Sequence, residues 1–120
     1  MVLSYALGWV LSMKRLKGPM EPHRWLLVAH EVSLQEGFLL LGCAFALQFA
    51  RLSHALAVTG AALLVAASVF QDLSGIINWL RDTGDQFAEK STGWVMASIN
   101  AVLNTAGIAI VAYGVVVGLA

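Results

Sequence analysis

Four side chains that could act as acids, bases or metal ligands lie inside apolar stretches of this sequence. They are His30, Glu31, Glu36 and Asp72, and away from the ends of these stretches no Lys or Arg accompanies them. An ionisable group in hydrocarbon is costly, so it faces a protein interior, carries a proton or serves a function. A neutral imidazole is a common haem or metal ligand, and carboxylates or amides near it can orient a substrate or move protons.

Long apolar stretches must hold these residues. Hydrophobic residues make up 59% of the 120-residue chain and charged residues 12%, a composition that excludes an ordinary soluble domain. Crossing a bilayer takes about twenty apolar residues. We expect full spans from about Pro22 to Phe49, from His54 to Leu80 and from Thr92 to Leu119, and a short first helix from Met1 to Met13. The sequence predicts an all-α fold: an integral membrane bundle of four transmembrane helices, the first one short, in a single domain over residues 1–120.

Several classes of function find no support in the sequence. The formal net charge is zero and there is no extended run of Lys or Arg, whereas binding nucleic acid needs a basic face. The lone Cys43 cannot form an internal disulfide, and no Cys/His zinc spacing occurs. Nucleophile motifs and phosphate-binding glycine loops are missing as well. We expect the partners to be the lipid bilayer and a small apolar substrate, with no nucleic acid.

Basic residues collect on one side of the expected bundle. In a chain that crosses the membrane repeatedly, every second connection lies on the same side. The side of the first and third connections holds Lys14, Arg15, Lys17, Arg24, Arg81 and Lys90, and only Arg51 lies on the other side. The positive-inside rule then predicts that the first and third connections are cytoplasmic and that both termini lie outside, in a protein of the bacterial inner membrane. Trp25, Trp79 and Trp94 lie at helix ends on the same side, where an interfacial aromatic belt would place them.

Polar residues of three helices are expected at one depth. In two antiparallel helices, residues equally far from the connecting turn lie at about the same depth. We therefore compare depths by counting residues outward from Leu52 for the first turn and from the region of Gln86 for the second. The polar layer that results, in the cytoplasmic half, contains His30, Glu36, Gln71, Asp72, Ser74, Asn100 and Asn104. Asn78 continues the stripe of Gln71 and Ser74. Gly75 and Gly107 lie on the same stripes, where small residues permit close helix packing or leave room for a ligand.

Two segments resemble a family of small integral-membrane isomerases, typified by styrene oxide isomerase and hydroxylaminobenzene mutase. The family shows Ala-His, five further residues and then Asn-Gly in its second helix. Here Ala29-His30 precede Glu36-Gly37, with an acid in place of the usual amide. The segment 75–80, Gly-Ile-Ile-Asn-Trp-Leu, resembles the family's third-helix Ala-Asn motif, and a polar loop and an apolar fourth helix follow it. The resemblance covers the chain from about Pro22 onward.

The resemblance implies a homo-oligomer in which His30 holds the iron of haem b, as the matching histidine does in styrene oxide isomerase. There the ferric iron acts as a Lewis acid on an epoxide oxygen, and a hydride shift gives an aldehyde. His30 is then the cofactor-binding residue and the metal ligand. The candidate catalytic residues, which would line the pocket of an epoxide or arylhydroxylamine substrate, are Glu36, Asp72, Asn78, Asn100 and Asn104. A dimer and a trimer both remain open.

Two other functions remain open. A small proton-coupled transporter would use Glu31, Glu36 and Asp72 to bind protons or a cationic substrate. A non-catalytic membrane subunit would contact a partner protein through the polar layer. Haem in the purified protein would favour the isomerase. Substrate binding that depends on pH and is lost when Asp72 is neutralised would favour the transporter, and a partner co-purifying in a fixed ratio would favour the subunit.

Overall fold

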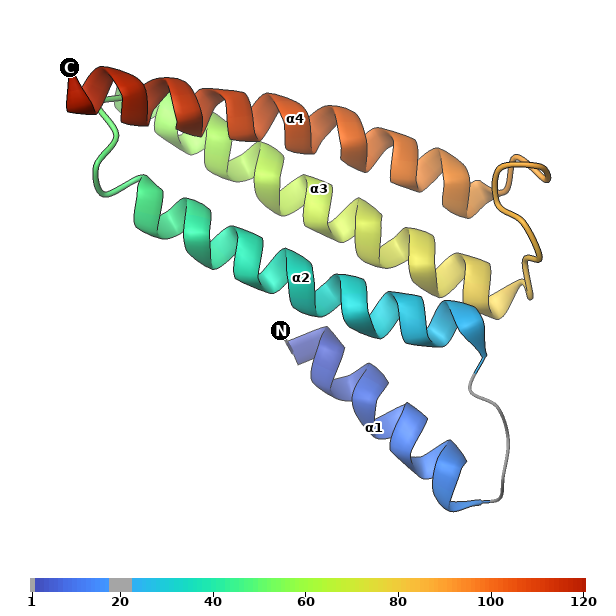
Figure 1. The fold of residues 1–120 in the computed structure, drawn as a ribbon. Helices are drawn as coiled ribbons and strands as arrows, with labels where there is room; N and C mark the ends of the chain where they lie inside the picture. The colour runs from blue at the N-terminus through green and yellow to red at the C-terminus, as the bar shows by residue number, and fades with distance from the viewer. Residues whose placement is uncertain (1, 18–22) are drawn as a thin grey trace.

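The computed structural model describes residues 2–17 and 23–120, and within these ranges it contains four α-helices and no strand (Figure 1). The helices are α1 (Val2–Leu16), α2 (Arg24–Ala46), α3 (His54–Leu80) and α4 (Thr92–Leu119). Helices α2, α3 and α4 are long and apolar enough to cross a membrane. The all-α architecture with a short first helix is therefore confirmed.

The helix boundaries follow the sequence closely, with differences at the first two helices. The expected limits of α3 and α4 are confirmed. Helix α1 continues past Met13 to Leu16, so its basic residues belong to its last turn. Helix α2 ends at Ala46, before the expected Phe49, because the chain turns at residues 47–49. Met1 and Pro22, the expected starts of the first two helices, lie outside the described residues.

Side-chain caps fix where the long helices begin. The Oγ atoms of Ser53 and Ser91 accept hydrogen bonds from the backbone N–H groups of Leu56 (3.3 Å) and Trp94 (3.1 Å). Serine at this position satisfies an amide that has no partner inside the helix. At α2 the Nδ1 atom of His23 accepts from the Trp25 N–H at 3.2 Å. These caps explain why the turns at residues 47–53 and 81–91 end where they do.

Helices α2, α3 and α4 run antiparallel, side by side, and α1 lies along the first half of α2 (Figure 1). Two glycines set the spacing. A Cβ atom on Gly75 would lie 2.9 Å from the Cβ of Ala29, and one on Gly107 would lie 2.7 Å from the Cγ of Leu64. Real Cβ atoms essentially never lie this close to another atom, so the missing side chain at each glycine allows the helices to pack closely.

The molecule is apolar on its outside and has a small interior. The main buried cluster joins α1 to α2 through Leu7, Leu11, Leu26 and Ala29. Large apolar side chains are exposed along α2, α3 and α4, among them Phe38, Phe45, Val69, Val102 and Val116. A soluble protein rarely exposes so much contiguous apolar surface. Such a surface suits contact with lipid chains.

One end of the bundle holds the 81–91 connection and most of the basic side chains. The C-terminal end of α1, the start of α2, the end of α3 and the 81–91 connection lie together there (Figure 1). Arg51 belongs to the opposite end, where its N–H donates to the Gly114 carbonyl at 2.9 Å. Trp25 lies in the first turn of α2, and its side chain packs inside the protein: it is only 7% exposed and its indole N–H donates to the Thr83 carbonyl at 2.5 Å.

Candidate functional site

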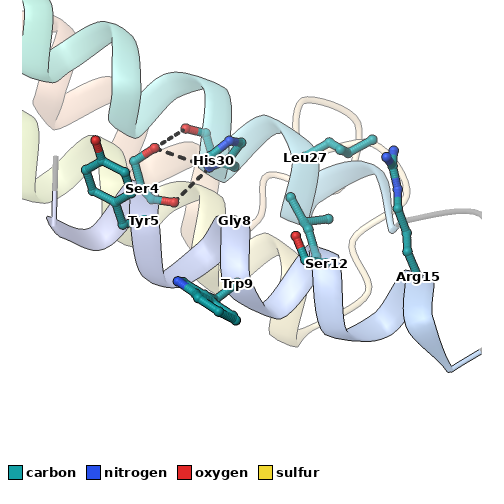
Figure 2. Close-up of a pocket in the computed structure, with 9 residues that line it drawn as sticks. Ser4, Tyr5, Gly8, Trp9, Ser12, Arg15, Leu27 and His30 are labelled. Carbon is teal, nitrogen blue, oxygen red and sulfur yellow. Dashed lines mark hydrogen bonds between the residues drawn. The ribbon is translucent and has the colours of Figure 1, made fainter.

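His30 lies on the face of α2 that packs against α1. Its Nδ1 atom is 2.8 Å from the backbone oxygen of Ser4 and 3.2 Å from the Ser4 hydroxyl, and that hydroxyl also lies 3.3 Å from the His30 carbonyl (Figure 2). A carbonyl oxygen can only accept, so Nδ1 carries the proton in this contact. The lone pair of Nε2 then remains free to bind a ligand.

A groove between α1 and α2 begins at this imidazole. Its volume is about 620 Å³, which falls within the range of roughly 300–1,000 Å³ usual for cofactor and ligand sites. The lining residues are Ser4, Tyr5, Gly8, Trp9, Leu11, Ser12 and Arg15 from α1, with Leu27 and His30 from α2. Figure 2 shows His30 and Arg15 toward opposite ends of the groove. The groove thus combines apolar walls, one imidazole and one cation.

Gly8 makes room for the imidazole. A Cβ atom at this position would lie 3.2 Å from Cε1 of His30, closer than most side-chain contacts. The spacing of Ser4, Gly8 and Ser12 at every fourth residue puts all three on one face of α1. The sequence-based prediction describes the first helix only as an apolar segment and does not include these residues. A stripe of small residues in an otherwise bulky helix is nevertheless visible in the sequence and indicates a close contact on that face.

The polar layer lies between α2, α3 and α4. Ser33 donates from Oγ to Oδ1 of Asp72 at 2.5 Å, and Asn100 donates from Nδ2 to Oε1 of Gln71 at 2.6 Å. Both pairs match, to within two residues, the depths obtained by reflecting the sequence about its two turns. The structure therefore brings Ser33 of α2 and Asn100 of α4 to the same level of α3, where they contact the adjacent residues Asp72 and Gln71.

Three oxygen atoms near this layer have no partner within the described residues. They are Oε2 of Glu36, Oδ1 of Asn100 and Oδ1 of Asn104, and all three are buried. The Glu36 side chain as a whole is only 9% exposed, and Asp72 is close enough to act on it electrostatically. A buried acceptor without a donor costs about 1–3 kcal/mol. Such oxygens therefore mark a place where a donor or a cation would be stabilised.

His30 is separated from this layer. Six residues of helix at about 100° each turn Glu36 about 120° away from His30 and about 9 Å along the axis. The imidazole faces Ser4 on α1, whereas Ser33 on the same helix faces α3. The sequence predicts that His30 lies in one layer with Glu36 and Asp72, and the structure contradicts this. These residues have two separate settings in the structure: His30 lies at the interface of α1 and α2, whereas Glu36 and Asp72 lie among the three long helices. Glu31 belongs to neither setting, because its side chain is exposed.

Asn78 has a third setting, at the connection between α3 and α4. It is fully buried, its Nδ2 donates to Oε1 of Gln86 at 2.9 Å, and its Oδ1 accepts from Oγ of Ser91 at 2.8 Å. A Cβ atom on Gly93 would collide with this amide. Both ends of the Asn78 side chain are therefore occupied in holding the polar connection.

The described part of the chain thus contains four helices, three of them able to span a membrane, together with a groove that holds a free imidazole nitrogen and a layer of buried oxygens. Among the described residues no three His, Cys, Asp or Glu side chains gather where they could hold a bare metal ion. A haem iron needs only a single side chain from the protein. No family model matches the sequence, and no curated protein or solved structure is significantly similar to it.

Proposed function

We propose that this chain is an integral membrane isomerase that holds haem b through His30 and rearranges a small apolar substrate in the groove between α1 and α2. The observation that carries the proposal is the pairing of Nδ1 with the Ser4 carbonyl at 2.8 Å. A backbone carbonyl on one ring nitrogen is the usual support for a histidine whose other nitrogen binds a metal, because it fixes the tautomer and the ring orientation.

The other groove residues suit the same group. Tyr5, Trp9 and Leu27 supply apolar walls for a flat macrocycle, and Arg15 supplies a cation for a porphyrin carboxylate. When bound, the iron supplies Lewis-acid activation of a substrate oxygen. The chain's own residues would hold and orient the cofactor and keep a small apolar substrate beside it. An intramolecular rearrangement of an epoxide or an arylhydroxylamine consumes no external reductant, which fits a small protein with one such site.

The groove also supports a homo-oligomer, dimer or trimer. Tyr5 and Trp9 line it yet remain 70% and 71% exposed in the single chain. A cofactor site usually buries most of its ligand. A second copy packed against α1 would cover these aromatic side chains and close the groove.

Activity of the purified protein tests the proposal directly. Wild-type protein, loaded with haem in lipid nanodiscs, is expected to convert an aryl epoxide or an arylhydroxylamine into a product of the same mass. His54→Ala, a change at an exposed histidine at the start of α3, is the control and is expected to keep full turnover. Failure of the haem-loaded wild type to form an isomer from either substrate class would reject the isomerase.

We also propose that the first and third connections are cytoplasmic and the termini outside, because the basic side chains collect at the end holding those connections. In a Cys43→Ser background, a membrane-impermeant maleimide applied to intact cells is expected to label Gln48→Cys and to leave Ala88→Cys unlabelled until lysis. Both positions are exposed in connections at opposite ends of the bundle. The reverse labelling pattern would show the opposite orientation.

A second function, transport of a proton or a cationic substrate, is favoured by one observation. Glu36 is buried between the long helices with an unpartnered oxygen and lies near Asp72. Buried acids of this kind in membrane helices commonly line ion and proton pathways. A transporter would show pH-dependent uptake of a cationic substrate into proteoliposomes, and neutralising Asp72 would abolish that uptake.

A further inference from the structure

We infer that the polar layer between α2, α3 and α4 is a binding site for a monovalent cation, with Glu36, Asp72, Asn100 and Asn104 supplying its oxygen ligands. The inference does not rest on the proposed isomerase, because none of these residues lines the groove at His30. It rests on which atoms are left without partners, on their depth in the bundle and on the charge they carry together.

The unpartnered atoms are all acceptors. Glu36 contributes Oε2, and Asn100 and Asn104 each contribute Oδ1, all buried. The orientation of Asn100 is fixed, because its Nδ2 donates to Gln71 at 2.6 Å and its Oδ1 is therefore the atom left over. Acceptors without donors are satisfied by a cation or by a molecule rich in N–H or O–H groups. Hard cations bind carboxylate and amide oxygens in preference to other groups.

These atoms lie at neighbouring levels of the bundle. The Ser33–Asp72 and Gln71–Asn100 contacts define one level across the three helices. Glu36 is three residues beyond Ser33, and Asn104 is four residues beyond Asn100, so each lies about one helical turn further along in the same direction. Antiparallel packing therefore places Glu36 and Asn104 at a common depth, on helices that both pack against α3.

The charge of the layer favours a single positive charge. Glu36 and Asp72 are acids, and the described residues show no salt bridge to either of them. The cost of dehydrating an ion in a low-dielectric medium rises with the square of its charge, so a monovalent ion suits this depth better than a divalent one. The Ser33 hydroxyl already donates to Asp72, which leaves the unpartnered oxygen of Glu36 as the main anionic ligand.

A small polar cavity offers access from the connection between α3 and α4. Its volume is about 70 Å³, and its polar lining residues are Gln71, Ser74 and Gln86. A cavity of this size holds a few water molecules, since one occupies about 30 Å³ in the liquid. Gln86 belongs to the connection, and Gln71 is the hydrogen-bond partner of Asn100. Water in this cavity would reach Gln71, the side chain that holds Asn100.

Direct binding of radioactive sodium ion tests the inference. Purified wild-type protein in sodium-free detergent buffer, with choline chloride holding the ionic strength, is expected to bind ²²Na⁺ saturably at about one ion per chain. Unlabelled Na⁺, K⁺, Li⁺ and NH₄⁺ are then compared as competitors to rank the ions. Glu36→Gln and Asn104→Leu are each expected to weaken binding roughly tenfold or more, a change of about 1.4 kcal/mol. His54→Ala, at an exposed histidine at the start of α3, is the control and is expected to bind as wild type does.

Thermal unfolding of the wild type supplies a second readout that needs no variant. A cation that binds the folded state alone raises Tm, and the rise grows with the logarithm of its concentration above Kd, so NaCl is expected to raise Tm above the value in choline chloride. Equal Tm values in all the salts, together with no saturable ²²Na⁺ binding, would overturn the inference. So would stabilisation by acidification alone, because a proton shared between Glu36 and Asn104 would then be the occupant. Wild-type binding in Glu36→Gln would overturn it too.

Discussion

His30→Ala is expected to remove haem from the protein. Among the described side chains that line the groove, Nε2 of this imidazole is the one nitrogen with a free lone pair, because Arg15 and the Trp9 indole are donors. Without it the apolar walls and Arg15 are left to hold the cofactor, and we expect the haem content after purification to fall at least about tenfold, as loss of metal-site support typically does. The absorbance of the haem Soret band relative to the protein band at 280 nm measures the loss.

Added imidazole separates loss of the ligand from loss of the fold. The alanine leaves space for a free imidazole beside Gly8, and we expect millimolar imidazole to restore part of the Soret band during reconstitution with haem. His54→Ala is the matched control, since it removes an exposed histidine at the start of α3 and is expected to keep all the haem. Retention of full haem content in His30→Ala would show that another residue binds the iron.

Asn78→Leu is expected to cause the largest loss of stability among the polar positions. The change removes the bonds to Gln86 (2.9 Å) and Ser91 (2.8 Å), and it leaves both partners facing an apolar side chain. Ser91 also caps α4 through Trp94, so the damage reaches the start of that helix. Two lost hydrogen bonds with unpaired partners cost about 2–4 kcal/mol. Unfolding in sodium dodecyl sulfate, followed by circular dichroism, gives the difference.

Asn104→Leu is the matched control for this prediction. Its Oδ1 has no partner among the described residues, so the same substitution breaks no hydrogen bond seen there through that atom. In sodium-free buffer we expect a change in the free energy of unfolding below about 1 kcal/mol. A loss at Asn104 as large as the loss at Asn78 would show that the Gln86 and Ser91 contacts are not what stabilises the connection.

Much of the fold follows from local signals in the sequence. The runs from His54 to Leu80 and from Thr92 to Leu119 are apolar, uninterrupted by Pro, and preceded by a capping serine, so their limits are predicted correctly. Reflection about the turns also gives the correct level for Asp72 against Ser33, because antiparallel helices joined by short turns cannot slide far. Depth is thus fixed by chain connectivity and helix rise alone.

Rotation of each helix about its own axis is harder to predict than depth. His30 and Ser33 are three residues apart and share a face by periodicity, yet His30 contacts α1 and Ser33 contacts α3. A helix surrounded by neighbours divides one polar face among them, and the sequence does not show where the boundary falls. Predicting the groove would further have required Ser4 and Gly8 of the short first helix. These residues carry no charge and differ from their neighbours only in their small size.

The two settings imply two separable properties of the chain. The groove at His30 lies between α1 and α2, and the buried oxygens of Glu36 and Asn104 lie among the three long helices. Variants in one are expected to leave the other unaffected, because the sites share no lining residue and face different neighbours. Haem content and sodium binding in the same purified preparations would show this independence.

The absorption spectrum of the wild-type protein tests the central claim most directly. The protein is purified in detergent from haem-replete cells, and spectra are recorded oxidised and then reduced with dithionite. We expect a Soret band that shifts on reduction, with about one haem per chain, because one groove supplies one free imidazole nitrogen. A colourless protein that also fails to bind added haem would contradict haem ligation by His30 and the isomerase proposed from it.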